Sequence, residues 1–150
     1  MTVVHRSVPP DAEATHPVIA VHCSDPRYQP HFQHFLRHGL QLDRYSLIAV
    51  PGGPQCFTLE TYLPKFSWAS LRWMKFLVNL MRPSRVVLIA HHDCRWYVDN
   101  RFADATNARE RQLADMRQAR ATLVDRFGPV PVDFYYATLR DGAAEFEHVD

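Results

Sequence analysis

The chain has 150 residues, 47% of them hydrophobic, which is enough for one domain with a hydrophobic core but too few for two ordinary domains. Its 17 basic and 16 acidic residues leave a net charge of +1, so no overall field draws it to nucleic acid or to an anionic membrane. Three cysteines cannot form a complete set of disulfides, and this favours a metal site. We expect a single domain over residues 1–150.

The N-terminal segment is polar and contains prolines, with no apolar stretch of the kind found in signal peptides. We expect residues 1–16 to form an extended arm. The most hydrophobic helical stretch is interrupted by Arg72 and Lys75, which argues against a membrane span. The sequence therefore predicts a soluble cytoplasmic protein with neither nucleic acid nor a membrane as partner.

The chain then begins with two short apolar runs separated by a helical pattern. Residues 18–21 predict a buried strand, and residues 29–37 predict a short helix that ends at Gly39. Residues 45–50 predict a second strand. The sequence Pro-Gly-Gly-Pro at 51–54 follows it directly and predicts a tight turn at the end of that strand.

The middle of the chain carries the most hydrophobic helix. Residues 66–81 predict a helix, and Pro83 ends it. The helix has more apolar positions than one buried stripe needs, so we expect it to be covered on most sides. Residues 85–90 form a continuous apolar run after Arg85 and predict the third strand.

A long charged helix and two strands complete the predicted fold. Residues 104–127 predict the helix, and residues 130–139 predict the fourth strand. The Asp-Gly pair at 141–142 predicts a hairpin to an antiparallel edge strand over residues 144–149. This alternation predicts an α/β fold: a mostly parallel sheet of about four strands, flanked by helices, with an antiparallel C-terminal edge strand.

Two clusters of reactive side chains follow two of these strands. Cys23, Asp25 and Arg27 come after the first strand, and His91 and Cys94 come after the third. The carboxyl ends of parallel strands lie at the same edge of a sheet, where ligands bind. Two thiols and one imidazole at that edge form a three-ligand set that leaves a zinc ion one open position.

The order Cys-x-Asp-x-Arg, Gly-rich turn and His-x-x-Cys resembles the β-class carbonic anhydrases, a family of zinc enzymes. The resemblance implies a zinc lyase (carbonate dehydratase) in which zinc-bound hydroxide hydrates carbon dioxide reversibly to bicarbonate. Carried over by motif, the Zn²⁺ ligands are Cys23, His91 and Cys94. Asp25 and Arg27 correspond to the family's dyad of a carboxylate and a guanidinium.

The dyad has a physical rationale and a simpler alternative. Asp25 could accept a hydrogen bond from the hydroxide and orient it, provided that the carboxylate stays off the metal. A bidentate Arg27 would hold it in place, which a lysine would do poorly. In the alternative, Asp25 caps the following turn and Arg27 is only solvated.

The chain departs from the family's pattern beside the site. Arg95 stands where the family has Gly, and would either narrow the pocket or add a contact for an anion. The turn at 50–53 lacks the family's Arg and Asn; we expect Gly52, Gly53 and Arg95 to line the pocket. Two alternatives remain open. One is a hydrolase of carbonyl sulfide or carbon disulfide, and the other is an inactive zinc-binding paralogue with Asp25 as fourth ligand or the pocket closed by Arg95.

The remaining histidines and the third cysteine have default structural roles. His22 and His92 flank the ligands and would point to the opposite face of their strands, so we interpret them as structural, with proton transfer as the alternative. Cys56 is expected to be a buried apolar side chain.

The aromatic residues of the helix at 66–81 point to self-association. One face of a sheet can cover only part of that helix, so Trp68, Trp73 and Phe76 favour a subunit interface. The resemblance implies the same, because the family builds its cleft between subunits. The sequence predicts a homodimer or a larger homo-oligomer.

Overall fold

The computed structural model describes residues 17–150, so the predicted extended arm at 1–16 lies outside the described residues. The strands are β1 (Val18–Cys23), β2 (Ser46–Val50), β3 (Arg85–His91), β4 (Val132–Arg140) and β5 (Ala143–Val149). The helices are α1 (Gln29–His34), the π-turn η1 (Phe35–Gly39), the 3-10 turn η2 (Gly53–Phe57), α2 (Pro64–Met81), α3 (Arg95–Asp99) and α4 (Ala108–Phe127).

The strands form one five-stranded sheet in the order β2-β1-β3-β4-β5. β2, β1, β3 and β4 run parallel, and β5 pairs antiparallel with β4. Asp141 and Gly142 join these two strands with positive φ angles of 49° and 80°, the conformation of a tight hairpin turn. The predicted α/β fold with its antiparallel edge strand is confirmed.

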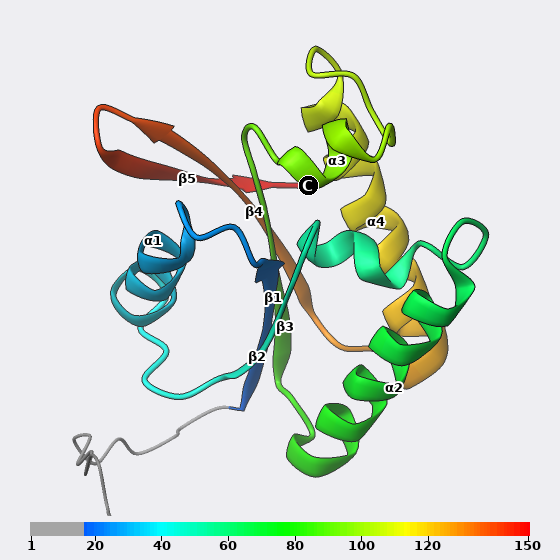
Figure 1. Ribbon diagram of the computed structural model, residues 1–150. Helices are drawn as coiled ribbons and strands as arrows, with labels where there is room; N and C mark the ends of the chain where they lie inside the picture. The colour runs from blue at the N-terminus through cyan, green and yellow to red at the C-terminus, as the bar shows by residue number, and fades with distance from the viewer. Residues whose placement is uncertain (1–16) are drawn as a thin grey trace, which may run out of the picture.

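Helices cover both faces of the sheet (Figure 1), and alternate residues of β1 pack against each layer. Ile19 and Val21 join the core under α2 and α4, whereas Val18 and Ala20 join the core under α1. All six residues of β1 are buried, as expected for a central parallel strand covered on both faces. The two reactive clusters are therefore attached to the two most enclosed strands of the sheet, β1 and β3.

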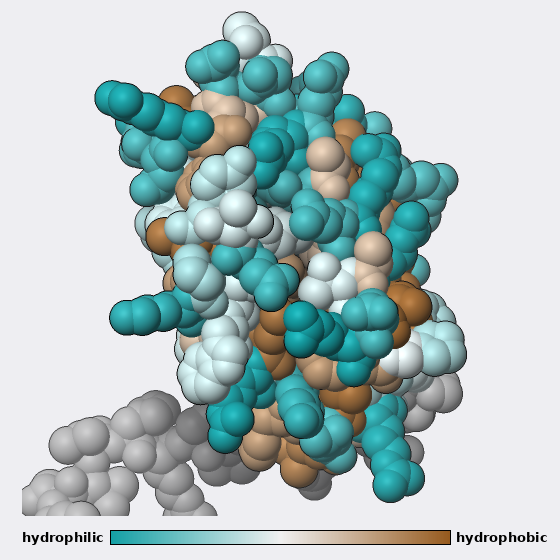
Figure 2. All heavy atoms as spheres, turned by 90° about the vertical axis from the view of Figure 1, so that its right-hand side faces the viewer, coloured by the Kyte–Doolittle hydropathy of each residue, from teal (hydrophilic) through white to brown (hydrophobic). Residues whose placement is uncertain are grey.

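The helix α2 is less covered than the sequence predicts. It begins at Pro64, which suits the first turn of a helix, and only Ser67, Ser70 and Met74 are fully buried. Large apolar side chains remain exposed on it: Trp68, Trp73, Phe76 and Leu80. A groove between α2 and α4 contains hollows of about 550 and 690 Å³, and Figure 2 shows hydrophobic side chains among hydrophilic ones on this side of the molecule.

Two further differences concern the segment after β3. The chain forms the short helix α3, which the sequence did not predict, and α4 begins at Ala108 rather than at residue 104. Five residues are too few to display a helical period, and the backbone before Ala108 turns instead, with the N–H of Asn107 donating to the carbonyl of Asp104.

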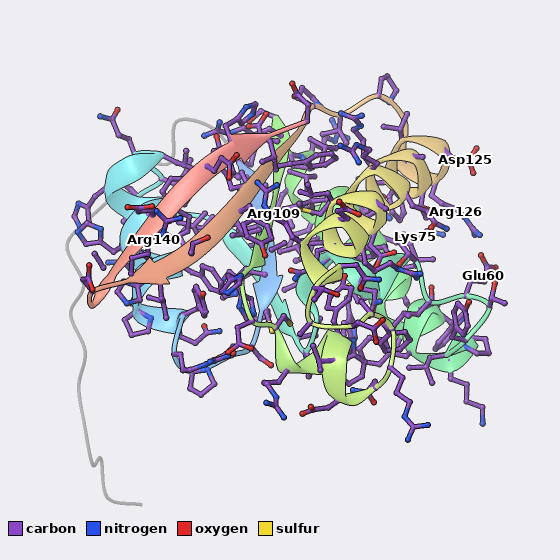
Figure 3. All side chains as sticks on the ribbon, turned by 90° about the horizontal axis from the view of Figure 1, so that it is seen from above. Glu60, Lys75, Arg109, Asp125, Arg126 and Arg140 are labelled. Carbon is purple, nitrogen blue, oxygen red and sulfur yellow. The ribbon has the colours of Figure 1, made fainter. Side chains whose placement is uncertain are left out.

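The charged residues of α4 mostly lie at its surface (Figure 3). Arg109 pairs with Glu147 of β5 at 2.7 Å, and Arg126 lies 4.0 Å from Glu60 beyond η2. Such exposed pairs add little stability. Among residues 17–150, none of the helices has the length and apolar character needed to cross a membrane.

Candidate metal centre

The pairing of β1 with β3 brings the first two ligand candidates together. Cys23 ends β1, His91 ends β3, and the two strands run parallel side by side. Cys94 follows three residues later as the N-cap of α3. The Cys23 Sγ, the Cys94 Sγ and a ring nitrogen of His91 lie within 4.8 Å of one another, and all three residues are buried.

The imidazole of His91 is oriented for ligation. Its Nδ1 lies 2.8 Å from the carbonyl oxygen of His92, which can only accept, so the proton resides on Nδ1. Its Nε2 is buried and has no hydrogen-bond partner among the described residues. The ring packs against Tyr28, with centroids 4.2 Å apart. A buried lone pair without a donor is costly, and a metal ion would satisfy it.

The two thiols lie close enough to share a proton. The sulfur atoms of Cys23 and Cys94 are 3.8 Å apart. The hydrogen bond from Cys94 lowers the pKa of Cys23 well below that of an ordinary thiol, against the opposing effect of burial. The same hydrogen bond, together with burial, raises the pKa of Cys94. Two thiolates and a neutral imidazole form a donor set that suits Zn²⁺ and other soft divalent metals.

Asp25 and Arg27 form a bidentate ion pair in front of these ligands. The Nη2 of Arg27 donates to Oδ2 of Asp25 at 2.7 Å, and its Nε donates to Oδ1 at 3.1 Å. The backbone N–H of Arg27 also donates to Oδ1, at 2.9 Å. These hydrogen bonds from Arg27 lower the pKa of Asp25, so the carboxylate stays ionised and directed toward the guanidinium.

Asp93 is a residue of the site that the sequence reasoning missed. Its carboxylate accepts from Nη1 of Arg27 at 2.9 Å, and its backbone carbonyl accepts from Nη2 at 2.9 Å. Asp93 has a positive φ of 54°, which turns the loop between His91 and Cys94 toward Arg27. The guanidinium is therefore anchored to both ligand-bearing segments. The sequence signal that could have identified Asp93 is its position as an acidic residue inside the His-x-x-Cys motif.

A hollow of about 510 Å³ opens in front of the two thiols and the dyad. Arg95 lies on its rim, where its guanidinium pairs with Asp99 at 2.8 Å. The predicted pocket glycines lie further back: Gly52 is buried beneath Trp96, and Gly53 packs against the backbone of β1. The hollow is lined by Cys23, Ser24, Asp25, Pro26, Arg27, Pro51, Cys94, Arg95, Trp96, Asp99 and Asn100.

The neighbouring histidines and Cys56 lie apart from the ligand set. His22 is buried against Phe32, its Nδ1 bonds the carbonyl of Cys23 at 2.9 Å, and burial lowers its pKa. A neutral, enclosed imidazole fits the structural interpretation. His92 is exposed just beyond β3. Burial raises the pKa of Cys56 to about 12, so this thiol stays protonated, and it lies outside the metal-ligating group found within residues 17–150.

Comparison with known proteins identifies the fold. No protein-family model matches the sequence, and no curated protein matches it significantly. A mutant of the β-carbonic anhydrase CafD of the filamentous fungus Aspergillus fumigatus matches with a TM-score of 0.51 at 15% identity, covering 96% of this chain and 94% of that one.

Two further solved structures have lower TM-scores. The β-carbonic anhydrase CafA of Aspergillus fumigatus gives 0.48 at 16% identity, over 90% of this chain and 76% of that one. β-Carbonic anhydrase isoform I of Trichomonas vaginalis gives 0.44 at 14% identity, over 95% and 87%. On the CafD match, which spans nearly the whole of both chains, this protein has the fold of a β-carbonic anhydrase.

Proposed function

We propose that the chain is a zinc enzyme that hydrates carbon dioxide reversibly to bicarbonate and a proton. The proposal rests above all on the buried Nε2 of His91, which has no hydrogen-bond partner within residues 17–150 and lies beside the two thiols at the strand ends. Zinc held by Cys23, His91 and Cys94 would supply Lewis acidity, which brings the ionisation of water into the neutral pH range. The fold of the β-carbonic anhydrase CafD supports the same reaction class.

The dyad supplies a fixed hydrogen-bond acceptor. Arg27 takes up the carboxylate of Asp25 through two side-chain nitrogens, and Asp93 fixes Arg27 in turn. The carboxylate of Asp25 is thus restrained from moving onto the metal, while Asp25 still lines the hollow. An ionised carboxylate in this position can accept a hydrogen bond from a water molecule and orient its lone pair toward carbon dioxide. The open hollow gives solvent a route for the released proton.

Stopped-flow hydration of carbon dioxide by the zinc-loaded protein tests the proposal. We expect activity that rises by up to about tenfold per pH unit until the reactive water is ionised, because the ionised form is the active one and is lost as the pH falls. Zinc-free protein is the control and should be inactive. A fully zinc-loaded protein that shows no hydration between pH 6 and 9 would contradict the function and leave the related hydrolase or an inactive zinc protein.

We also propose that the chain functions as a homodimer or larger homo-oligomer. β2 is an outer strand of the sheet, and within residues 17–150 only β1 pairs with it, so its other edge is open there. Beside it, a hollow of about 590 Å³ is lined by Leu47 of β2 and by Trp73 and Phe76 of α2. Phe76 is 64% exposed and Trp73 is 47% exposed. A free strand edge beside an apolar helix face is a surface that soluble proteins usually cover.

Sedimentation velocity at micromolar concentration checks the assembly. We expect a species of at least twice the chain mass of 17.4 kDa, and Phe76→Asp should shift the protein to the monomer because it places a charge in an apolar contact. His34→Asn, on the opposite face of the sheet, should leave the assembly unchanged. A wild-type protein that sediments only at 17.4 kDa refutes this prediction.

A further inference from the structure

A buried carboxylate on α4 collects hydrogen bonds from the segments around the metal centre. The side chain of Asp115 is only 4% exposed. Its Oδ2 accepts from the Tyr97 hydroxyl at 3.0 Å and from Nε2 of Gln55 at 3.0 Å. Its Oδ1 accepts from Nε of Arg111 at 3.1 Å. Asp115 thus joins α4 to α3, which follows Cys94, and to η2, which follows the glycine turn.

This carboxylate fixes the orientation of the Gln55 amide. An ionised carboxylate can only accept hydrogen bonds, so Gln55 must present its NH₂ group to Asp115 and its oxygen to the other side. There the oxygen accepts from the indole Nε1 of Trp96 at 2.7 Å. Gln55 is completely buried, and water therefore does not compete for either bond. Trp96 donates to Gln55, and Gln55 donates to Asp115, so the amide of Gln55 has only one possible orientation.

Trp96 is the part of this chain of hydrogen bonds that reaches the site. Its side chain lines the hollow in front of Cys23 and Cys94. The indole lies so close to Gly52 that a β-carbon there would be 2.3 Å from its Cδ1 atom. On its other sides the ring stacks on Phe66 and contacts Phe102, with centroids 6.1 and 5.9 Å away. The position of the indole therefore requires a glycine at 52, which leaves room for the ring, and a hydrogen-bond acceptor at 55 for its N–H group.

We infer that Gln55 and Asp115 are positioning residues that hold Trp96 as a fixed wall of the metal pocket. This wall restricts the pocket to small, linear ligands, whether neutral molecules or anions. The inference rests on the proposed function, because it names what sets the width of the same site. Asp115 and Gln55 do not touch the substrate themselves. The effect of Asp115 passes through Gln55 to the indole of Trp96. A wall held by buried hydrogen bonds discriminates by size more sharply than a mobile side chain.

Acrylamide quenching of Trp96 fluorescence tests the positioning without any metal. Trp68→Phe and Trp73→Phe, both at exposed positions, leave Trp96 as the only indole of the three in the chain. In that background, Gln55→Glu places two carboxylates together. Asp115→Asn replaces a carboxylate that can only accept by an amide that can also donate, so the orientation of Gln55 is no longer fixed. We expect the quenching constant to rise about twofold or more in each. The double variant has one carboxylate and one amide again, exchanged between the two positions, and should restore the low value.

Tyr97→Phe is the matched control. It removes one hydrogen bond from the same carboxylate but leaves the bonds between Trp96, Gln55 and Asp115 intact, so quenching should stay at the parent value. Equal quenching in all variants overturns the inference, and so does a Tyr97→Phe effect as large as that of Gln55→Glu. Failure of the double variant to restore the parent value, when its thermal melt equals the parent's, overturns it as well.

Ligand selectivity of the Co²⁺-loaded protein tests the size limit. We expect the dissociation constant of benzenesulfonamide, relative to that of thiocyanate, to fall about tenfold in Gln55→Glu. Trp96→Phe, which lacks the indole N–H and sits at a partly exposed position, should show the same change even if the buried variants fold poorly. An unchanged ratio in Trp96→Phe overturns the size limit. Failure of Co²⁺ to bind would instead contradict the proposed metal site, and the quenching result would still stand.

Discussion

Replacement of Cys23 by serine or of His91 by alanine is expected to weaken zinc binding strongly. Zinc at such a site contributes roughly 10–16 kcal/mol of binding free energy, shared among about four ligands, so losing one lowers the affinity by about 70- to 1,000-fold. At a zinc concentration about a thousandfold above the wild-type Kd, the lost stabilisation is about 2.5–4 kcal/mol, or roughly 10 °C in Tm. Elemental analysis and thermal melts with and without zinc measure both effects.

Cys56→Ser is the control for this experiment. Its thiol is buried in η2 and lies outside the ligand group found in the described part of the chain, so one zinc per chain should remain. The variant also measures how much the Tm falls when a buried thiol is replaced by a hydroxyl without any loss of metal, because burying a hydroxyl is itself destabilising. Full zinc occupancy in either Cys23→Ser or His91→Ala would remove these residues from the assignment.

Arg27→Ala is expected to abolish hydration while the protein keeps its zinc. Without the guanidinium, the carboxylate of Asp25 loses all three side-chain hydrogen bonds that restrain it beside Cys23. A free carboxylate next to three ligands becomes the fourth ligand and occupies the position that water needs. Asp25→Ala should also retain zinc, with turnover lowered by about 10- to 1,000-fold through the lost hydrogen-bond acceptor.

The absorption spectrum of the Co²⁺-loaded protein separates these two effects without an activity measurement. We expect the spectrum of Arg27→Ala to differ from that of the wild type, and the double variant Arg27→Ala with Asp25→Ala to return toward it, because no carboxylate remains to bind. Asp93→Asn removes the charge that pairs with Arg27 but keeps the backbone carbonyl that accepts from it, so its effect should lie between the wild type and Arg27→Ala. Identical spectra for Arg27→Ala and the wild type would show that Arg27 does not restrain Asp25.

The strand-end position of the ligand candidates could be predicted because it depends on short segments. A continuous apolar run predicts a buried strand, and the residue after it lies at the carboxyl edge of a parallel sheet. Cys23 and His91 follow such runs directly, and the structure places them side by side. The hairpin before β5 could be predicted for a similar reason, since Asp-Gly favours one turn type by its backbone preferences.

The partners of Arg27 and Trp96 could not be predicted in this way. Asp93 lies 66 residues from Arg27, and Gln55 lies 60 residues from Asp115. A helical aspartate is usually solvated, and nothing in the sequence around Asp115 marks it as buried. The short helix α3 has no periodicity to reveal it, although it begins directly after Cys94, which is its N-cap.

The sequence by itself determined the order of the strands and longer helices, the parallel sheet and the set of two thiols and one imidazole at its edge, because local apolar periodicity and turn chemistry act within a few residues. Only the tertiary structure decided how Arg27 is anchored, which wall Trp96 forms and how much of α2 remains exposed. These features depend on side chains from different elements that meet when the sheet and helices pack. Their contact energies are set by three-dimensional proximity, which no local pattern encodes.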